Sequence, residues 1–175
     1  MPALLEGKDK PADNAECLAL AQLCVEHKKL YAASAGFYAK ALAAQPELAK
    51  DPVACVRYNA ACVALLAAAG RGKDADKLED KERARLRRQA MDWLQADLAL
   101  WNKLADSDDP KAHGAVLQWM NHWQTDADLA GLRDKEAIEK LPKAQRARCQ
   151  KLWADVDALL ARVKPKAKQA PSDKP

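Results

Sequence analysis

The sequence predicts an all-α protein whose antiparallel helix pairs stack as a short solenoid. Alanine and leucine supply much of the 49% hydrophobic fraction, whereas the whole chain has six glycines and one phenylalanine. This composition favours helices over strands. Apolar residues recur at the i, i+3, i+4, i+7 spacing of an amphipathic helix. The predicted helices form three pairs with similar face patterns, at residues 14–45, 52–105 and 109–163, which is typical of a repeat architecture.

Capping and helix-breaking residues mark the ends of the predicted helices. Asn14, with Asp13 beside it, is the expected N-cap of the first helix. Pro46 should end the second helix, and Pro52 should occupy the first position of the third, where its missing N–H does no harm. Together with the apolar stripes, these signals predict helices at about 14–29, 31–45, 51–69, 79–105, 109–124 and 142–163.

Residues 125–141, between the last two predicted helices, are expected to form a short helix or a loop, and three further segments fall outside the helices. Residues 1–13 are expected to be an irregular leader, and residues 71–80 a flexible charged connector. Residues 164–175 are rich in proline and lysine, so we expect a disordered basic tail there. The helical domain between leader and tail covers residues 14–163.

Charge and hydropathy argue against nucleic-acid and membrane partners. The net charge is +4 and the isoelectric point is about 8.8, with much of the positive excess in the last dozen residues. So mild a balance does not predict nucleic-acid binding. The longest apolar runs are broken by charges, so no membrane span is expected, and the first residues lack the pattern of a signal peptide. A cytoplasmic location is therefore the expectation.

The five cysteines predict neither disulfides nor a metal site. Cys17 and Cys24 are seven residues apart, as are Cys55 and Cys62, so on a helix the two thiols of each pair would lie roughly 10 Å apart. This separation is too large for a disulfide. The spacing of cysteines and histidines does not match a zinc-ligand pattern. We expect all five cysteines to be free packing residues, and no metal or cofactor.

No motif in the chain predicts catalysis. The stretch GRGKD, which starts at Gly70, comes nearest to a phosphate-binding loop, but it follows a helix and lacks the Ser or Thr hydroxyl of such a loop. We interpret it as a helix stop at Gly70 and Gly72. Nucleophiles and histidines are not placed with partners by any local motif. The chain is therefore not expected to be an enzyme.

The tryptophans are expected to be core residues. Trp93 and Trp101 would form one seam along a helix, and Trp119 and Trp123 would face Trp153 in a second seam. Trp153 lies within the best amphipathic stripe of the chain, which is why we expect it to be buried. The alternative is that at least one of the five is exposed, and an exposed tryptophan would mark a partner site.

The segment LALAQLCVEHKKLYAASAGFYAKALAAQP resembles a tetratricopeptide repeat. Leu20 and Ala21 match the Leu–Gly contact of the first helix of such a repeat, if one extra residue is allowed in the following turn. The second helix of the repeat is matched by Tyr31, Ser34, Tyr38, Ala41 and Pro46. The residues from Asn59 to Ala64, within RYNAACVALLAAAG, match the first helix of a second repeat.

Nearly the whole chain, from Pro2 to Val163, resembles the C-terminal tetratricopeptide region of planctomycete-type bacterial proteins. Many of those proteins carry a serine/threonine kinase domain ahead of this region, but no kinase signature is present in this sequence. The resemblance implies a tetratricopeptide-like interaction or scaffolding module that binds a protein or peptide partner, a serine/threonine kinase among the candidates. The alternative that it implies is a detached regulatory C-terminal segment of such a kinase.

The resemblance also indicates candidate binding residues. Asn59 occupies a position at which tetratricopeptide helices often turn an Asn into the concave groove, where it can bond a peptide backbone, and Gln22 is a second groove candidate. For Asn59 the alternatives are a local hydrogen bond or simple exposure. The stretch KERARLRRQ is either a phosphate-binding basic face or a solvated one, and its candidate residues are Arg83, Arg85, Arg87 and Arg88.

Overall fold

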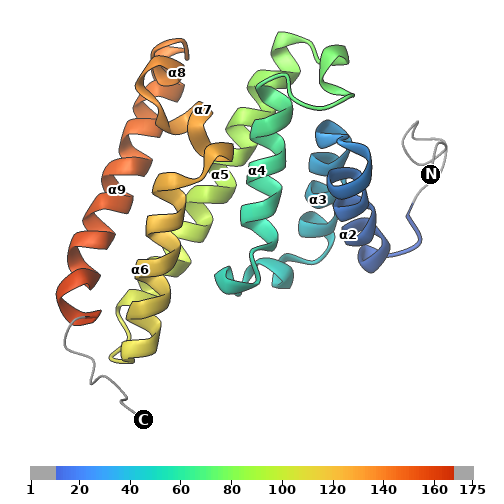
Figure 1. Ribbon diagram of the computed structural model, residues 1–175. Coiled ribbons are helices and arrows are strands. Elements are labelled where there is room, and N and C mark those ends of the chain that lie inside the picture. The colour runs from blue at the N-terminus through green and yellow to red at the C-terminus, as the bar shows by residue number, and fades with distance from the viewer. Residues whose placement is uncertain (1–10, 168–175) are drawn as a thin grey trace. The chain divides into compact units, whose positions relative to one another are not determined.

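The computed structural model describes residues 11–167, and every regular element in that range is helical (Figure 1). The all-α prediction is therefore confirmed. Most of the predicted leader and the end of the predicted tail lie outside the described residues. The last helix continues to Ala167, so residues 164–167 of the predicted tail are helical rather than disordered. None of the described helices has the length and apolar character needed to span a bilayer.

The chain divides into two compact units, Met1–Asp97 and Leu98–Pro175, which are called here the N-terminal and the C-terminal unit. The boundary falls inside the long helix α5, Asp80–Ala105. The other elements of the N-terminal unit are α2 (Asn14–Leu23), a π-helical turn (Cys24–Lys28), α3 (Tyr31–Ala44), α4 (Val56–Ala68) and the 3-10 turns Pro46–Ala49, Pro52–Ala54 and Ala75–Lys77. The C-terminal unit continues with α6 (Pro110–Thr125), a 3-10 turn (Ala127–Leu129), α7 (Ala130–Arg133), α8 (Lys135–Glu139) and α9 (Lys143–Ala167).

The N-cap of helix α2 lies one residue before the predicted one. Asp13 is the N-cap, and its side chain accepts the N–H of Glu16 at 2.8 Å. Asn14 is instead the first helical residue, and its amide donates to the carbonyl of Ala41 near the end of α3 at 3.1 Å. Both residues can cap a helix, so the sequence alone does not decide between them. In the fold Asn14 joins the start of α2 to the end of α3.

Helices α3 and α4 pack against each other and lie side by side in Figure 1, and many of their buried residues are alanines. On α4 the side chains of Ala60, Ala61, Ala64 and Ala67 are fully buried. Small side chains let two helix backbones approach closely, and each buried methyl group still adds to the hydrophobic stabilisation. This packing explains why the RYNAACVALLAAAG stretch contains so few functional groups.

The predicted helix at 51–69 is interrupted at Cys55. Asp51 caps a separate 3-10 turn, Pro52–Ala54, by accepting the N–H of Val53 at 2.9 Å. Cys55 then adopts a left-handed conformation with φ 59°, and α4 starts at the next residue. The Cys55 thiol donates back to the carbonyl of Val53 at 3.0 Å. Cys55 is only half-buried and precedes the helix that contains Cys62. The prediction that the two cysteines share a helix face is therefore wrong.

The C-terminal unit is built on the packing of α6 against α9, with α7 and α8 also in contact with α9. Val116, Met120 and Trp123 on α6 are fully buried. The end of α9 is tied to the end of α5, because Arg162 donates to the carbonyl of Asn102 at 3.1 Å and pairs with Asp106 at 3.2 Å. These contacts leave the segment α7–α8 beside the first half of α9 (Figure 1).

Candidate functional site

The C-terminal unit carries an open depression of about 380 Å³. Helices α6 and α9 and the α7–α8 segment each contribute to its walls. We call it the α6–α9 depression. It is lined by Gln124, Arg133, Ile138, Gln150, Trp153 and Asp157. The set combines one aromatic, one aliphatic and four polar side chains, which is a composition suited to contact with another molecule.

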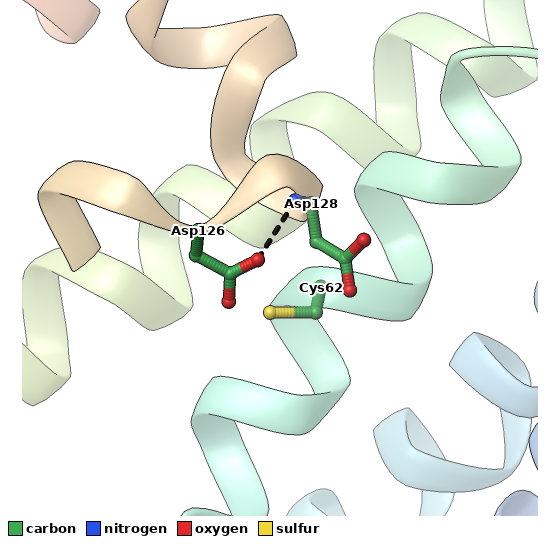
Figure 2. Close-up of side chains that lie close together, drawn as sticks. All are labelled: Cys62, Asp126 and Asp128. Atoms are coloured by element: carbon green, nitrogen blue, oxygen red, sulfur yellow. Dashed lines mark hydrogen bonds between the residues drawn. The ribbon is translucent and has the colours of Figure 1, made fainter. Parts of the chain in front are cut away.

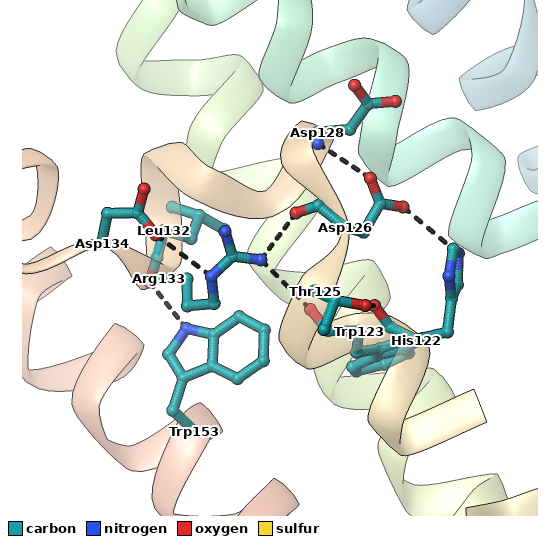
Figure 3. A network of polar contacts seen from close by, with 9 residues as sticks. All are labelled: His122, Trp123, Thr125, Asp126, Asp128, Leu132, Arg133, Asp134 and Trp153. Atoms are coloured by element: carbon teal, nitrogen blue, oxygen red, sulfur yellow. Dashed lines mark hydrogen bonds and ion pairs between the residues drawn. The ribbon is translucent and has the colours of Figure 1, made fainter. Parts of the chain in front are cut away.

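Trp153 is half-buried and lines this depression, whereas the sequence analysis predicted a buried core residue. Its indole Nε1 donates to the carbonyl of Leu132 in α7 at 2.7 Å (Figure 3). The predicted partners are engaged elsewhere: Trp119 stacks on Trp101 with ring centroids 6.0 Å apart, and Trp123 is fully buried. The prediction for Trp153 is therefore wrong in its burial, because Trp153 lies at the edge of the apolar stripe of α9.

Arg133 also lines the depression, and it holds the end of α6 in place. Its Nη1 donates to the carbonyl of Asp126 at 2.6 Å, and its Nε pairs with the carboxylate of Asp134 at 3.1 Å (Figure 3). The main-chain carbonyls after a helix end need such donors, since they have no intrahelical partner. The Arg133 charge is thus compensated within its own segment.

Asp126 organises the turn that follows α6. Its Oδ1 accepts the main-chain N–H of Asp128 at 2.8 Å, which makes Asp126 the N-cap of the short 3-10 turn (Figure 2). Its Oδ2 lies 3.3 Å from Nε2 of His122 on the last turn of α6. Through these two contacts Asp126 fixes the shape of the turn after α6, and the carbonyl of the same residue binds Arg133.

The remaining polar contact of the depression joins α6 to α9. Gln124 donates its amide N–H to Oδ1 of Asp157 at 2.6 Å. Asp157 is exposed and lies one helical turn after Trp153, on the same face of α9. Gln150 lies one turn before Trp153 and is also exposed.

The predicted groove residues both lie in the N-terminal unit and are exposed. Asn59 is on α4 and Gln22 is on α2, the two helices that pack against α3. Within residues 11–167 neither side chain forms a hydrogen bond, so the local hydrogen bond considered for Asn59 is not made.

The four predicted basic-face arginines have different environments on α5. Arg83 is turned toward the connector, where it donates to the carbonyls of Leu78 and Ala75 at 3.1 and 2.8 Å. Arg85 forms a two-pronged ion pair with Glu82, and this hydrogen-bonded pairing lowers the pKa of Glu82. Burial, assisted by the charge of Arg83, lowers the pKa of Arg87, while Arg88 is exposed. Only part of this set therefore faces solvent.

The connector before α5 is fastened to the turn between α2 and α3, rather than flexible as predicted. Asp74 accepts the N–H of Ala33 at 2.9 Å and so caps α3 from a distant part of the chain. The N–H of Lys73 donates to the carbonyl of Lys29 at 2.8 Å. Gly72 has φ 95°, and a Cβ there would lie 2.8 Å from the same carbonyl, so only glycine fits.

A buried ion pair joins α4 to α5 within the N-terminal unit. Asp97 is 2% exposed, and Nη1 of Arg57 lies 3.0 Å from its Oδ1, although this N–H is not aligned for a hydrogen bond. Arg57 also donates to the carbonyl of Ala49 at 2.9 Å. Burial raises the pKa of Asp97 to about 7 against the opposing effect of the Arg57 charge.

The sequence analysis did not identify Asp97, although the sequence contained a signal. Asp97 lies three residues after Leu94 and four before Trp101, so it falls within the apolar stripe of α5. A carboxylate in such a stripe is expected to be buried and therefore paired. Its burial places it out of reach of a substrate, so we assign it to the packing of the helices.

The cysteines are free, and four of them are buried. Burial raises the thiol pKa of Cys17, Cys24 and Cys149, and also that of the half-buried Cys55. A raised pKa disfavours the thiolate, which is the form that attacks substrates and binds metals.

Comparison of the chain with protein-family models, curated proteins and solved structures finds no match. Function is therefore inferred from two surfaces of the molecule. One is the pair of exposed amides on α2 and α4, and the other is the α6–α9 depression with its half-buried tryptophan.

Proposed function

We propose that this protein is a non-catalytic interaction module of the tetratricopeptide type, which binds a protein or peptide partner through the helices of its N-terminal unit. The observation that carries the proposal is the contact between α2 and α3. Ala21 and Ser34, which the sequence analysis matched to small positions of the repeat, are both fully buried, and the Ser34 hydroxyl donates to the Ala21 carbonyl at 2.9 Å. Small residues at these positions let the two helices of a repeat pack closely.

The turn between the two helices also supports a repeat. The resemblance requires one extra residue here, and α2 ends in the π-helical turn Cys24–Lys28, which holds more residues per turn than an α-helix. Lys29 then takes a left-handed conformation with φ 54°, and the N–H of Leu30 donates to the carbonyl of Cys24 at 2.9 Å. The extra residue is absorbed without a break in the packing of α2 on α3.

Asn59 and Gln22 are the residues through which such a module would hold a peptide backbone. A side-chain amide can donate to a carbonyl and accept an N–H of an extended peptide at once. Both amides are exposed, and neither is hydrogen-bonded to another of the described residues 11–167, so binding would not break a hydrogen bond within that part of the chain. A serine/threonine kinase is one partner of this class, and a kinase reading frame directly upstream in the genome would favour it.

Selection of peptides from a displayed random library by the purified chain tests the proposal. We expect selected peptides to bind with an affinity that Asn59→Ala lowers by roughly five- to tenfold, the value of one or two hydrogen bonds. Asn121→Ala is the matched control, since Asn121 is an exposed Asn on α6 in the other unit. Affinity can be measured by fluorescence anisotropy. If no peptide is enriched, or if Asn59→Ala and Gln22→Ala leave every selected affinity unchanged, the proposal is wrong.

A further inference from the structure

The α6–α9 depression presents an aromatic surface whose orientation is already fixed. The Nε1 of Trp153 is bonded to the carbonyl of Leu132 at 2.7 Å, so the polar edge of the indole is satisfied inside the unit (Figure 3). The rest of the half-buried ring lines the depression beside the apolar side chain of Ile138. An ordered aromatic ring loses little entropy on binding, which is why tryptophans are common at interfaces.

The charges around this ring leave a net negative site. The positive charge of Arg133 is paired with Asp134 at 3.1 Å and further engaged by the carbonyl of Asp126. Asp157, in contrast, is bonded only to the neutral amide of Gln124, and no cationic side chain pairs with it among the described residues. Of the charges lining the depression, that of Asp157 is therefore the one left uncompensated.

An uncompensated carboxylate one helical turn from an indole ring is complementary to a cation. The ring attracts the cation through its π electrons, and the carboxylate adds an ion pair. The aliphatic stem of a lysine or arginine would at the same time cover the apolar surface of Ile138 and Trp153. A volume of about 380 Å³ suits one long side chain with a few neighbouring atoms rather than a whole folded element.

We propose that the α6–α9 depression docks a lysine or arginine side chain from an exposed segment of a partner protein. The inference adds a second contact surface to the interaction module proposed above, and it shares with that proposal only the assumption that the partner is a protein. The exposed amide of Gln150, one turn before Trp153, is placed to bond the main chain next to the docked side chain.

The test is a nuclear magnetic resonance titration of the full chain, observed at the indole N–H signal of Trp153. The probe is a capped five-residue peptide with one central arginine, and the comparison peptide carries the neutral analogue citrulline. We expect saturable shifts of the Trp153 signal with the arginine peptide and affinity about fivefold weaker in Asp157→Asn, because an exposed ion pair is worth up to about 1 kcal/mol. Trp153→Phe assigns the signal.

Matched variants separate this proposal from the alternatives. Asp157→Asn keeps an acceptor for Gln124, and Asp155→Asn on the same helix should have no effect because Asp155 is paired with Lys151 at 2.8 Å. Asn59→Ala should also leave this titration unchanged, so that failure of the groove proposal can be recognised separately. Equal shifts with the citrulline peptide, or an unchanged affinity in Asp157→Asn, would overturn the inference.

The inference would also be overturned if the α6–α9 depression were filled by the tail of this chain or by a second copy of it. Removal of residues 168–175 would change the Trp153 signal in the absence of peptide if the tail of this chain filled the depression. A dependence of the signal on protein concentration alone would identify a second copy of the chain as the occupant.

Discussion

Replacement of Asp97 by asparagine should stabilise this protein at alkaline pH and leave its stability at acidic pH nearly unchanged. Asparagine has the shape of a protonated aspartic acid but carries no charge. In the wild-type protein Asp97 is almost fully buried, and burial raises its pKa from 3.8 to about 7 despite the Arg57 guanidinium beside it. The folded state therefore holds a proton that the unfolded chain releases near pH 4.

The direction and size of the effect follow from this difference in proton binding. Between about pH 4 and pH 7 the folded state binds more protons than the unfolded state, so the free energy of unfolding falls as the pH rises. A pKa about three units above its ordinary value corresponds to roughly 4 kcal/mol once both states are ionised. This contribution is fully present below the unfolded pKa and is lost as the pH rises through the folded pKa. Asp97→Asn should abolish this dependence.

Urea unfolding, followed by helical circular dichroism between pH 5 and pH 8, measures the effect. Other carboxylates also titrate, for example Glu82 with its lowered pKa, so the informative quantity is the difference between Asp97→Asn and the wild type at each pH. We expect this difference to grow in favour of the variant across the range, up to a few kcal/mol. A variant that is less stable than the wild type at pH 8 would show that the Arg57 pair outweighs burial, and it would refute the reasoning.

Three further predictions follow from the same structure. Asp74→Ala should lower the free energy of unfolding by about 1–2 kcal/mol because α3 loses its cap, whereas Asp76→Ala in the same connector should have little effect; equal midpoints of thermal unfolding would contradict this. A thiol reagent should modify about one cysteine of the native protein quickly, and Cys55→Ser should abolish this fast phase, because Cys55 alone among the five is half-buried; a fast phase that persists would mean that another thiol is accessible. Trp153→Ala should cost about 2 kcal/mol, less than the 3–5 kcal/mol expected at the fully buried Trp123, and equal losses would restore Trp153 to the core.

Local sequence signals predicted the helices well, because the information needed lies within each helix. Pro46 follows the end of α3 as expected, and Gly70, with φ 79°, follows the end of α4. The break at Cys55 was not predicted, because cysteine has no preference for the left-handed backbone conformation that it adopts here. It arises because Asp51 and Pro52 close a turn before α4 begins.

Contacts between distant segments were the part that the sequence did not predict. Asp74 caps α3 from 41 residues away, and nothing in the composition of the connector distinguishes it from Asp76. The prediction that Trp153 is buried was wrong for a related reason. At 100° per residue it lies at the edge of the arc formed by Leu152, Val156 and Leu160, and the sequence pattern cannot show how far the neighbouring helix covers that arc.

The use that the chain makes of its polar side chains favours binding over catalysis. Arg83, Arg133 and Asp74 all form hydrogen bonds to main-chain groups at turns and helix ends. Asp97, whose pKa is strongly raised, is buried out of contact with solvent. A catalytic group needs access to a substrate, and the raised pKa of Asp97 is not accompanied by such access. The two surfaces proposed for binding use amides, a carboxylate and an indole ring, which can bond to or pack against a peptide without taking part in a reaction. In the proposed module, the small residues pack the helices closely and the exposed side chains of the two surfaces carry recognition.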